Sequence, residues 1–266
     1  MTFVQILTPF LLFILGTCIG SFLSVVIHRL HEGKTGIVFG RSQCPKCKYV
    51  LRPVDLIPLL SYIFTRGKCR SCKKSISLTY PFLELITGAT FLMLYLFMNN
   101  LYVNADLTSI SLLAFYHLLF CAFIFTFFYD LKYMEVNDHV VIPMIALSLL
   151  MLLHPLYPLT WQSSLIGLAI PVVFFALQII ISKGKWIGGG DLRIGALIGL
   201  PLGTGPTVVA LILGYLLGAI ISLLLLTRPG FTRKSMIPFG PFLVTGFYIA
   251  FFFGNTLVDW YLNVLL

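Results

Sequence analysis

Seven apolar stretches in this 266-residue chain are each long enough to cross a membrane. A helix needs about 20 mostly apolar residues to span about 30 Å of hydrocarbon. An eighth stretch, at about 190–203, is shorter and rich in glycine. We therefore expect an all-α polytopic membrane protein with about eight transmembrane helices. The seven longer stretches lie at about 4–27, 81–99, 109–129, 139–156, 162–182, 206–227 and 237–260.

The few charged residues agree with this expectation. They make up 10% of the chain, and the mean hydropathy is +0.99, values that exclude an ordinary soluble domain. Eleven of the eighteen Lys and Arg lie within residues 29–74, and the others fall on the same side if the N-terminus lies outside. Omitting the glycine-rich span would place Arg228, Arg233 and Lys234 outside, so the positive-inside rule supports that span. We expect both termini outside, and topology explains the net charge of +9 without nucleic-acid binding.

Residues 29–80 form the one connection large enough for a small cytosolic domain. It contains two Cys-x-x-Cys pairs, Cys44 with Cys47 and Cys69 with Cys72, separated by 21 residues. So small a domain needs a metal ion or disulfides for stability, and disulfides rarely persist in the cytosol. Four thiolates in two such pairs suit a tetrahedral Zn²⁺ in a zinc-ribbon-like domain. A redox pair and metal-free cysteines are the alternatives.

Two aspartates occur in similar sequences at the cytosolic ends of predicted spans. Asp130 is followed by Leu and Lys, and Asp191 by Leu and Arg. A carboxylate in the hydrocarbon region costs about 2.5–3.5 kcal/mol, which makes both residues functional candidates. Two carboxylates close together share one proton, so the ionised one can activate water while the protonated one polarises a peptide carbonyl.

Glycines precede the second aspartate. Gly188 and Gly190 lack Cβ atoms and leave the main chain open to an extended peptide. The competing interpretation is that the aspartates cap helices and neutralise Lys132 and Arg193. From the residue pattern alone, both interpretations explain Asp130 and Asp191 equally well.

A series of motifs extends across nearly the whole chain. Residues 188–193 read GGGDLR, and residues 130–132 read DLK. Together with the motifs below, these resemble the type IV prepilin peptidases, also called leader peptidase/N-methyltransferases, whose signature is Gly-x-Gly-Asp. The other motifs, in the order expected for that family, are GSFLSVVIHR at 20–29, RSQCPKC at 41–47, LIPLLSY at 56–62, YPFLEL at 80–85 and IPFGPF at 237–242.

The resemblance implies an aspartyl protease of the bacterial inner (plasma) membrane, with Asp130 and Asp191 as catalytic residues. Its substrates would be prepilin or pseudopilin precursors, cut after a glycine to remove a basic leader. It also implies N-methylation of the new N-terminus with S-adenosylmethionine, an activity associated with the cysteine-bearing segment. The implied division is residues 1–28 as the first span, 29–80 as the cysteine domain and 81–266 as the protease bundle.

The sequence departs from the family pattern in two places. Ser24 replaces the usual asparagine, which bears on methylation more than on proteolysis. Glu135, Asp138 and His139 add polar groups near Asp130, and either carboxylate is a spacing alternative to Asp130. Glu84 matches a family position for which two roles are open, contact with the methyl donor or stabilisation of the bundle.

Two other functions remain as alternatives. A transporter can also hold paired aspartates and glycine-broken helices, but it predicts a carboxylate near mid-membrane and two similar halves, neither of which the sequence contains. A zinc-bearing membrane scaffold without catalysis would tolerate Asp→Asn at both aspartates.

Overall fold

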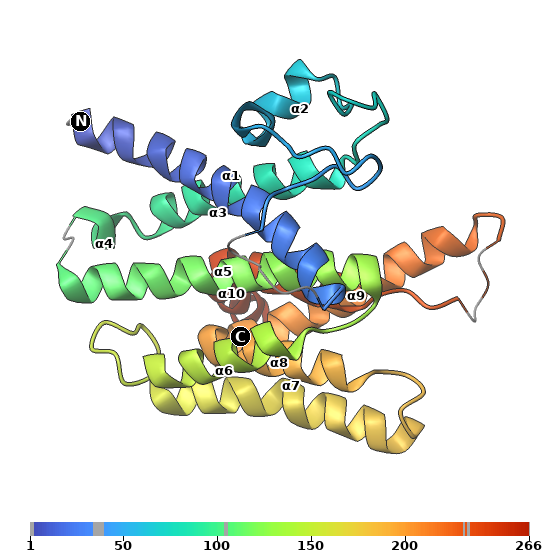
Figure 1. The fold of residues 1–266 in the computed structure, drawn as a ribbon. Coiled ribbons are helices and arrows are strands. Elements are labelled where there is room, and N and C mark those ends of the chain that lie inside the picture. The colour runs from blue at the N-terminus through green and yellow to red at the C-terminus, as the bar shows by residue number, and fades with distance from the viewer. Residues whose placement is uncertain (1–2, 34–39, 104–105, 231, 233–234, 266) are drawn as a thin grey trace. The chain divides into compact units, whose positions relative to one another are not determined.

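The computed structural model describes residues 3–33, 40–103, 106–230, 232 and 235–265. Lys34, Arg233 and Lys234, which the charge argument used, lie outside these ranges. Within them the chain is helical, with no strand longer than an isolated bridge (Figure 1). The elements are α1 Phe3–His31, η1 Pro53–Leu56, α2 Leu60–Phe64, α3 Thr79–Phe97, α4 Asn99–Val103, α5 Leu107–Tyr133, α6 Asp138–Met151, α7 Trp161–Ser182, α8 Gly189–Leu202, α9 Thr204–Leu226 and α10 Gly240–Leu265.

The predicted all-α membrane fold is confirmed. In the described part of the chain, six helices are long and apolar enough to cross a membrane, namely α1, α3, α5, α7, α9 and α10. They coincide with six of the seven long apolar stretches. The two remaining predicted spans are the shorter helices α6 and α8, with 14 residues each. At 1.5 Å per residue such a helix is about 21 Å long, so neither crosses about 30 Å of hydrocarbon by itself.

The chain forms two compact units. One contains Met1–Asp106 and Leu113–Phe125, and the other contains Leu107–Leu112 and Thr126–Leu266. The first unit therefore joins α1, the cysteine domain and α3 in a single body. The sequence-based division at residues 28 and 80 stays a prediction.

In the first unit, α1 and α3 lie side by side in backbone contact. Gly16 and Gly20 form a Gly-x-x-x-Gly motif on α1, and a Cβ atom at Gly16 would lie 2.8 Å from the Cα atom of Gly88. At Gly20 it would lie 2.8 Å from the Cα atom of Glu84. Small residues let membrane helices approach this closely and gain van der Waals contact. The contact also fixes Glu84 against α1.

In the second unit, α8 is the central element. It contacts α6, α7, α9 and α10, and its residues 194–202 are all buried. Helices on several sides shield its backbone from lipid, so a short helix is tolerated there. At its end Gly203 has φ +71°, a conformation that glycine adopts readily, and α9 begins at the next residue.

The tightest contact of α8 is with α7. Gly199 and Gly167 face each other, and a Cβ atom on either residue would overlap the carbonyl oxygen of the other. α9 and α10 meet in a similar way, because a Cβ atom at Gly246 would overlap the carbonyl oxygen of Ala210. Close packing in this unit therefore depends on glycine at helix crossings.

Replacing Gly199 by alanine is expected to lower the free energy of unfolding by about 1–3 kcal/mol, because the methyl group has no space against the α7 backbone. Thermal unfolding of the detergent-purified protein measures the effect. Gly189→Ala in the same helix is the matched control, since a Cβ atom there meets nothing within 4 Å. Equal stability of Gly199→Ala and Gly189→Ala would contradict the packing described here.

Candidate active site and metal centre

Four cysteines from two loops form one cluster. The sulfur atoms of Cys44, Cys47, Cys69 and Cys72 all lie within 4.8 Å of one another. The Sγ atoms of Cys47 and Cys69 are 3.9 Å apart. Tetrahedral zinc with Zn–S bonds of about 2.3 Å separates its sulfur ligands by about 3.8 Å. The four thiols therefore fit a single tetrahedral metal ion.

The two cysteine knuckles have the same backbone structure. Lys48 donates its N–H to the carbonyl of Cys44 at 2.9 Å, and Lys73 donates to Cys69 at 2.9 Å. Both lysines adopt left-handed conformations, with φ of 59° and 58°. Each knuckle closes with one antiparallel bridge, and the bridges are Gln43–Val50 and Lys68–Ser75. The sequence similarity of the knuckles thus corresponds to a structural repeat.

An ion pair joins the η1 segment to the second knuckle. The Nε atom of Arg70 donates to Oδ1 of Asp55 at 2.8 Å, and the backbone N–H of Arg52 donates to Oδ2 at 3.2 Å. Burial alone would raise the pKa of Asp55, but these two hydrogen bonds and the two arginine charges outweigh it and hold that pKa below its usual value. Asp55 is therefore ionised and structural at neutral pH.

Glu84 anchors the cysteine domain to α3. Its side chain is among the buried polar groups, and its Oε2 atom accepts a hydrogen bond from the backbone N–H of Leu59 at 2.8 Å. Leu59 has φ +60°, which a leucine adopts only when its surroundings hold it there. Ser21 of α1 also hydrogen-bonds to Glu84. Of the two roles open for Glu84, stabilisation is therefore visible, and contact with a methyl donor stays a prediction.

Asp130, near the end of α5, is buried, with 6% of its surface exposed. Its Oδ2 atom accepts a hydrogen bond from the backbone N–H of Gly240 at 2.9 Å. A Cβ atom at Gly240 would lie 2.6 Å from the same oxygen, so only glycine leaves space for this contact. The first turn of α10 therefore orients the Asp130 carboxylate.

Asp191 is the third residue of α8, whose N-cap residue is Gly188, and its backbone N–H donates to the carbonyl oxygen of Gly188 at 3.2 Å. A carboxylate in the first turn of a helix suits the helix dipole. The charge of Asp130 acts on Asp191, so the two carboxylates lie within electrostatic reach of each other. The structure thus brings together the two aspartates that the sequence singled out.

The two motif glycines have different structural roles. A Cβ atom at Gly190 would lie 2.5 Å from Cγ2 of Val136, whereas at Gly188 the nearest atom would be 4.0 Å away. Gly190 therefore lets the start of α8 lie against the segment that follows α5. At Gly188 no side-chain clash explains why the residue is glycine.

Of the three additional polar residues near Asp130, Glu135 lies just before α6, and Asp138 and His139 are the first two residues of that helix. Asp138 accepts a hydrogen bond from the guanidinium of Arg193, which links the starts of α6 and α8. Glu135 and His139 are exposed. Sequence reasoning did not identify Arg193 and Asp138 as partners, and it did not identify Gly240 as the donor to Asp130. The IPFGPF motif was the available signal for Gly240, but it gave no indication of the contact.

Two interacting carboxylates of this kind can catalyse hydrolysis without a metal ion. One carboxylate, when ionised, can take a proton from water, and the other, when protonated, can donate a hydrogen bond to a carbonyl oxygen. The backbone N–H of Gly240 fixes the orientation of the Asp130 carboxylate before any substrate binds.

Comparisons with known proteins cover both parts of the chain. Residues 14–98 match the Bacterial Peptidase A24 N-terminal domain, and residues 117–223 match the Type IV leader peptidase family. The prepilin leader peptidase/N-methyltransferase of Bacillus subtilis is 31% identical over 262 residues, which cover 96% of this chain and 98% of that protein. The protein of the same name from Aeromonas salmonicida is 29% identical over 286 residues, which cover 96% of this chain and 94% of that protein. The one from Pseudomonas aeruginosa is 28% identical over 277 residues, which cover 94% of this chain and 92% of that protein. No solved structure matches the chain.

The contact between Gly190 and Val136 generates a rescue prediction. Gly190→Ala is expected to lower the free energy of unfolding by about 1–3 kcal/mol through overpacking. Val136→Ala in the same chain should restore part of this loss because it removes the Cγ2 atom in the way. Thermal unfolding of the two single variants and the double variant measures the coupling, with Gly188→Ala as the matched control. Strictly additive effects would show that the two side chains do not meet.

Proposed function

Because the chain belongs to the type IV leader peptidase family, we propose that it removes the leader from prepilin or pseudopilin precursors, with Asp130 and Asp191 as the catalytic pair. The observation that carries this proposal is the buried carboxylate of Asp130, which the backbone N–H of Gly240 orients and which lies within electrostatic reach of Asp191. The capping interpretation explains Asp191, but not the burial of Asp130 beside it.

In the proposed reaction, the ionised aspartate takes a proton from water as the water oxygen bonds to the scissile carbonyl carbon. The protonated aspartate donates a hydrogen bond to the carbonyl oxygen. The carbon–nitrogen bond then breaks, and the leaving nitrogen takes the proton that the general base received. Gly190 keeps the start of α8 close to the segment that follows α5. Because residues 188–190 are all glycine, the main chain next to Asp191 carries no side chains there.

The second proposed activity is N-methylation of the new N-terminus, as the names of the relatives say of those proteins. S-adenosylmethionine supplies the methyl group: the amine lone pair forms the nitrogen–carbon bond, the carbon–sulfur bond breaks with its electrons left on sulfur, and the amine proton goes to water. We assign Zn²⁺ to the four cysteines because their spacing fits four thiolate ligands. The metal is structural in this proposal.

The proposed cellular location is the bacterial inner (plasma) membrane, with the cysteine domain in the cytosol and both termini outside. The concentration of Lys and Arg in residues 29–74 supports this orientation. A basic leader would then stay in the cytosol, and the bond to be cut would lie where the apolar substrate helix leaves the membrane. A transporter and a zinc-bearing scaffold without catalysis are the functions that this proposal excludes.

Asp130→Asn and Asp191→Asn are each expected to reduce leader removal by at least about 10²-fold, because each substitution removes one partner in proton transfer. Co-expression with a prepilin and mass spectrometry of its N-terminus measures the effect. Glu135→Gln is the control, since this exposed carboxylate lies in the same segment. Normal processing by both aspartate variants would overturn the proposed mechanism. Loss of processing in Glu135→Gln alone would indicate that Glu135 is the catalytic carboxylate in place of Asp130.

Purified protein is expected to contain about one zinc ion per chain, as four thiolates complete one tetrahedral site. Cys44→Ser should lower both the zinc content and the thermal stability of the protein, because metal binding stabilises so small a domain. Cys121→Ser, in a buried helix position outside the cluster, should keep its zinc. Elemental analysis decides the question, and wild-type protein without zinc would contradict the assignment.

A further inference from the structure

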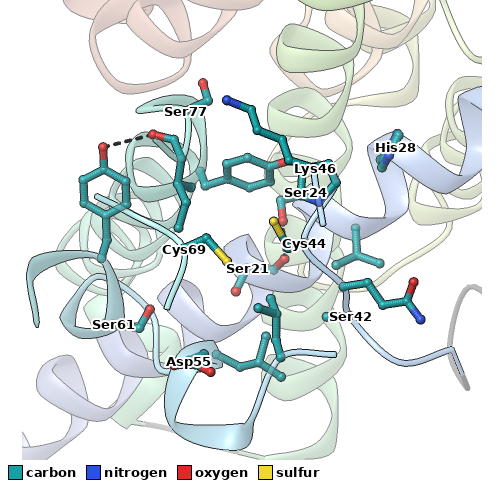
Figure 2. A pocket seen from close by; sticks show the side chains of 18 of the residues that line it. Ser21, Ser24, His28, Ser42, Cys44, Lys46, Asp55, Ser61, Cys69 and Ser77 are labelled. Atoms are coloured by element: carbon teal, nitrogen blue, oxygen red, sulfur yellow. Dashed lines mark hydrogen bonds between the residues drawn. The ribbon is translucent and has the colours of Figure 1, made fainter. Parts of the chain in front are cut away.

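Polar side chains gather in different ways in the two units. In the first unit, Ser21, Ser24 and Asp55 are among the residues that line a cavity beside the metal centre (Figure 2). The two aspartates belong to the second unit. Side chains that support the aspartates by direct packing are therefore those of the second unit.

A pair of polar side chains joins two long helices of the second unit. Gln178 lies on α7 and Tyr215 on α9, and both are half-buried. The Nε2 atom of Gln178 donates to the Tyr215 hydroxyl at 2.9 Å, and the hydroxyl donates to Oε1 of the same amide at 3.1 Å. A hydroxyl that both donates to and accepts from one amide is fixed in position. The pair therefore fixes the ring of Tyr215 relative to α7.

The ring of Tyr215 packs against Phe239, in the segment that leads into α10. The two ring centroids are 4.9 Å apart and the ring planes meet at 66°, an edge-to-face geometry that aromatic pairs prefer. The Phe239 ring also lies close to the α9 backbone, since a Cβ atom at Gly218 would lie 3.4 Å from its Cε2 atom. Its centroid is 6.5 Å from that of Phe175 on α7. Residues of both α7 and α9 thus hold Phe239 in place.

The peptide unit between Phe239 and Gly240 connects this aromatic packing to the first aspartate. Its N–H group, on Gly240, donates to Asp130. Its carbonyl oxygen, on Phe239, accepts from the backbone N–H groups of Phe242 at 3.0 Å and Leu243 at 3.2 Å. Because a peptide unit is planar, its two ends move together. A shift of Phe239 would therefore move the N–H group away from the Asp130 carboxylate.

Tyr215 also lies near the second aspartate. The charge of Asp191 acts on the Tyr215 hydroxyl, so the two groups lie within electrostatic reach of each other. Tyr215 is thus connected to Asp130 through the Phe239–Gly240 peptide unit and is close to Asp191 through its hydroxyl.

We propose that Tyr215, fixed by Gln178, is a positioning residue for leader removal, which holds the Phe239–Gly240 peptide unit where its N–H group meets the Asp130 carboxylate. The inference rests on the proposed peptidase function and adds a residue to the support of its aspartate pair. It also gives the IPFGPF motif a role, because Phe239 supplies the ring and Gly240 the N–H group. Misplacing a catalytic group by about 1 Å can cost about 10²-fold in rate.

The test is the kinetics of leader removal by the purified full-length protein in nanodiscs, with a prepilin as substrate. Tyr215→Leu removes the ring, so kcat should fall by about tenfold or more while KM changes by less than about twofold. Tyr215→Phe keeps the ring and loses the hydrogen bonds to Gln178, so kcat should fall by only about threefold. Tyr248→Leu is the matched control, because Tyr248 is another half-buried tyrosine of the second unit and its ring packs on Phe247. Its kcat should stay within about twofold of the wild type.

A double variant tests whether the two rings act through one group. Phe239→Leu alone should lower kcat by about tenfold or more, as Tyr215→Leu does. The double variant should be within about threefold of the slower single variant, because both substitutions displace the same N–H group. Effects that multiply in the double variant would show that the two residues act separately, and the inference would be overturned. A role limited to stabilising the helix bundle would lower the unfolding temperature of these variants and leave the kcat of the folded protein unchanged.

The outcomes separate this inference from the proposed function. If Asp130→Asn is inactive and Tyr215→Leu has the kcat of the wild type, the inference is wrong and the peptidase function stands. If the wild type does not remove the leader, the proposed function fails and the inference with it. If Tyr215→Leu does not fold, Tyr215→Phe and Gln178→Leu decide, since each breaks the hydrogen bonds between α7 and α9. Each should lower kcat by about threefold, and wild-type kcat in both would overturn the inference.

Discussion

Backbone contact at glycine is the interaction on which the helix pairs of this protein depend. Lipid is as apolar as a leucine side chain, so apolar burial gives little drive for helices to associate inside a membrane. The helices must instead gain van der Waals contact by approaching closely, and Gly16 against Gly88 and Gly167 against Gly199 allow this in the two units. The functional groups follow from these contacts. The α1–α3 contact fixes Glu84 beside Ser21, and the α7–α8 contact holds the helix that begins with the Asp191 segment.

The buried carboxylate of Asp130 is oriented by a main-chain donor and not by a second side chain. A backbone N–H next to a helix start is fixed in position by the helix itself, so it orients a carboxylate without the entropy cost of ordering a second side chain. Gly240 gives such a group to Asp130 from the start of α10, and Asp191 lies in the first turn of α8. Two helix starts therefore converge on the pair. Their positive ends also favour the negative charge that one of the two carboxylates must carry.

The sequence predicted the features that depend on local composition. Apolar length identified the six long spans, and the Cys-x-x-Cys repeat identified the cluster of four thiols. The short helix α8 was predicted only through the placement of basic residues, because glycine weakens its hydropathy. Long-range contacts could not be predicted. The hydrogen bond from Gly240 to Asp130 joins residues 110 positions apart, and the one from Leu59 to Glu84 joins residues 25 apart. No local pattern specifies such a pair, since it arises only when the helices have packed.

The position of Glu84 shows how one residue can answer two requirements. A carboxylate at the first turns of a membrane helix is costly unless its oxygens are hydrogen-bonded, and Leu59 and Ser21 provide those bonds. The same bonds hold the LIPLLSY segment in its unusual turn, where Leu59 has φ +60°. An apolar residue at position 84 would avoid the burial cost, but it would leave the backbone N–H of Leu59 without its acceptor and would release that segment.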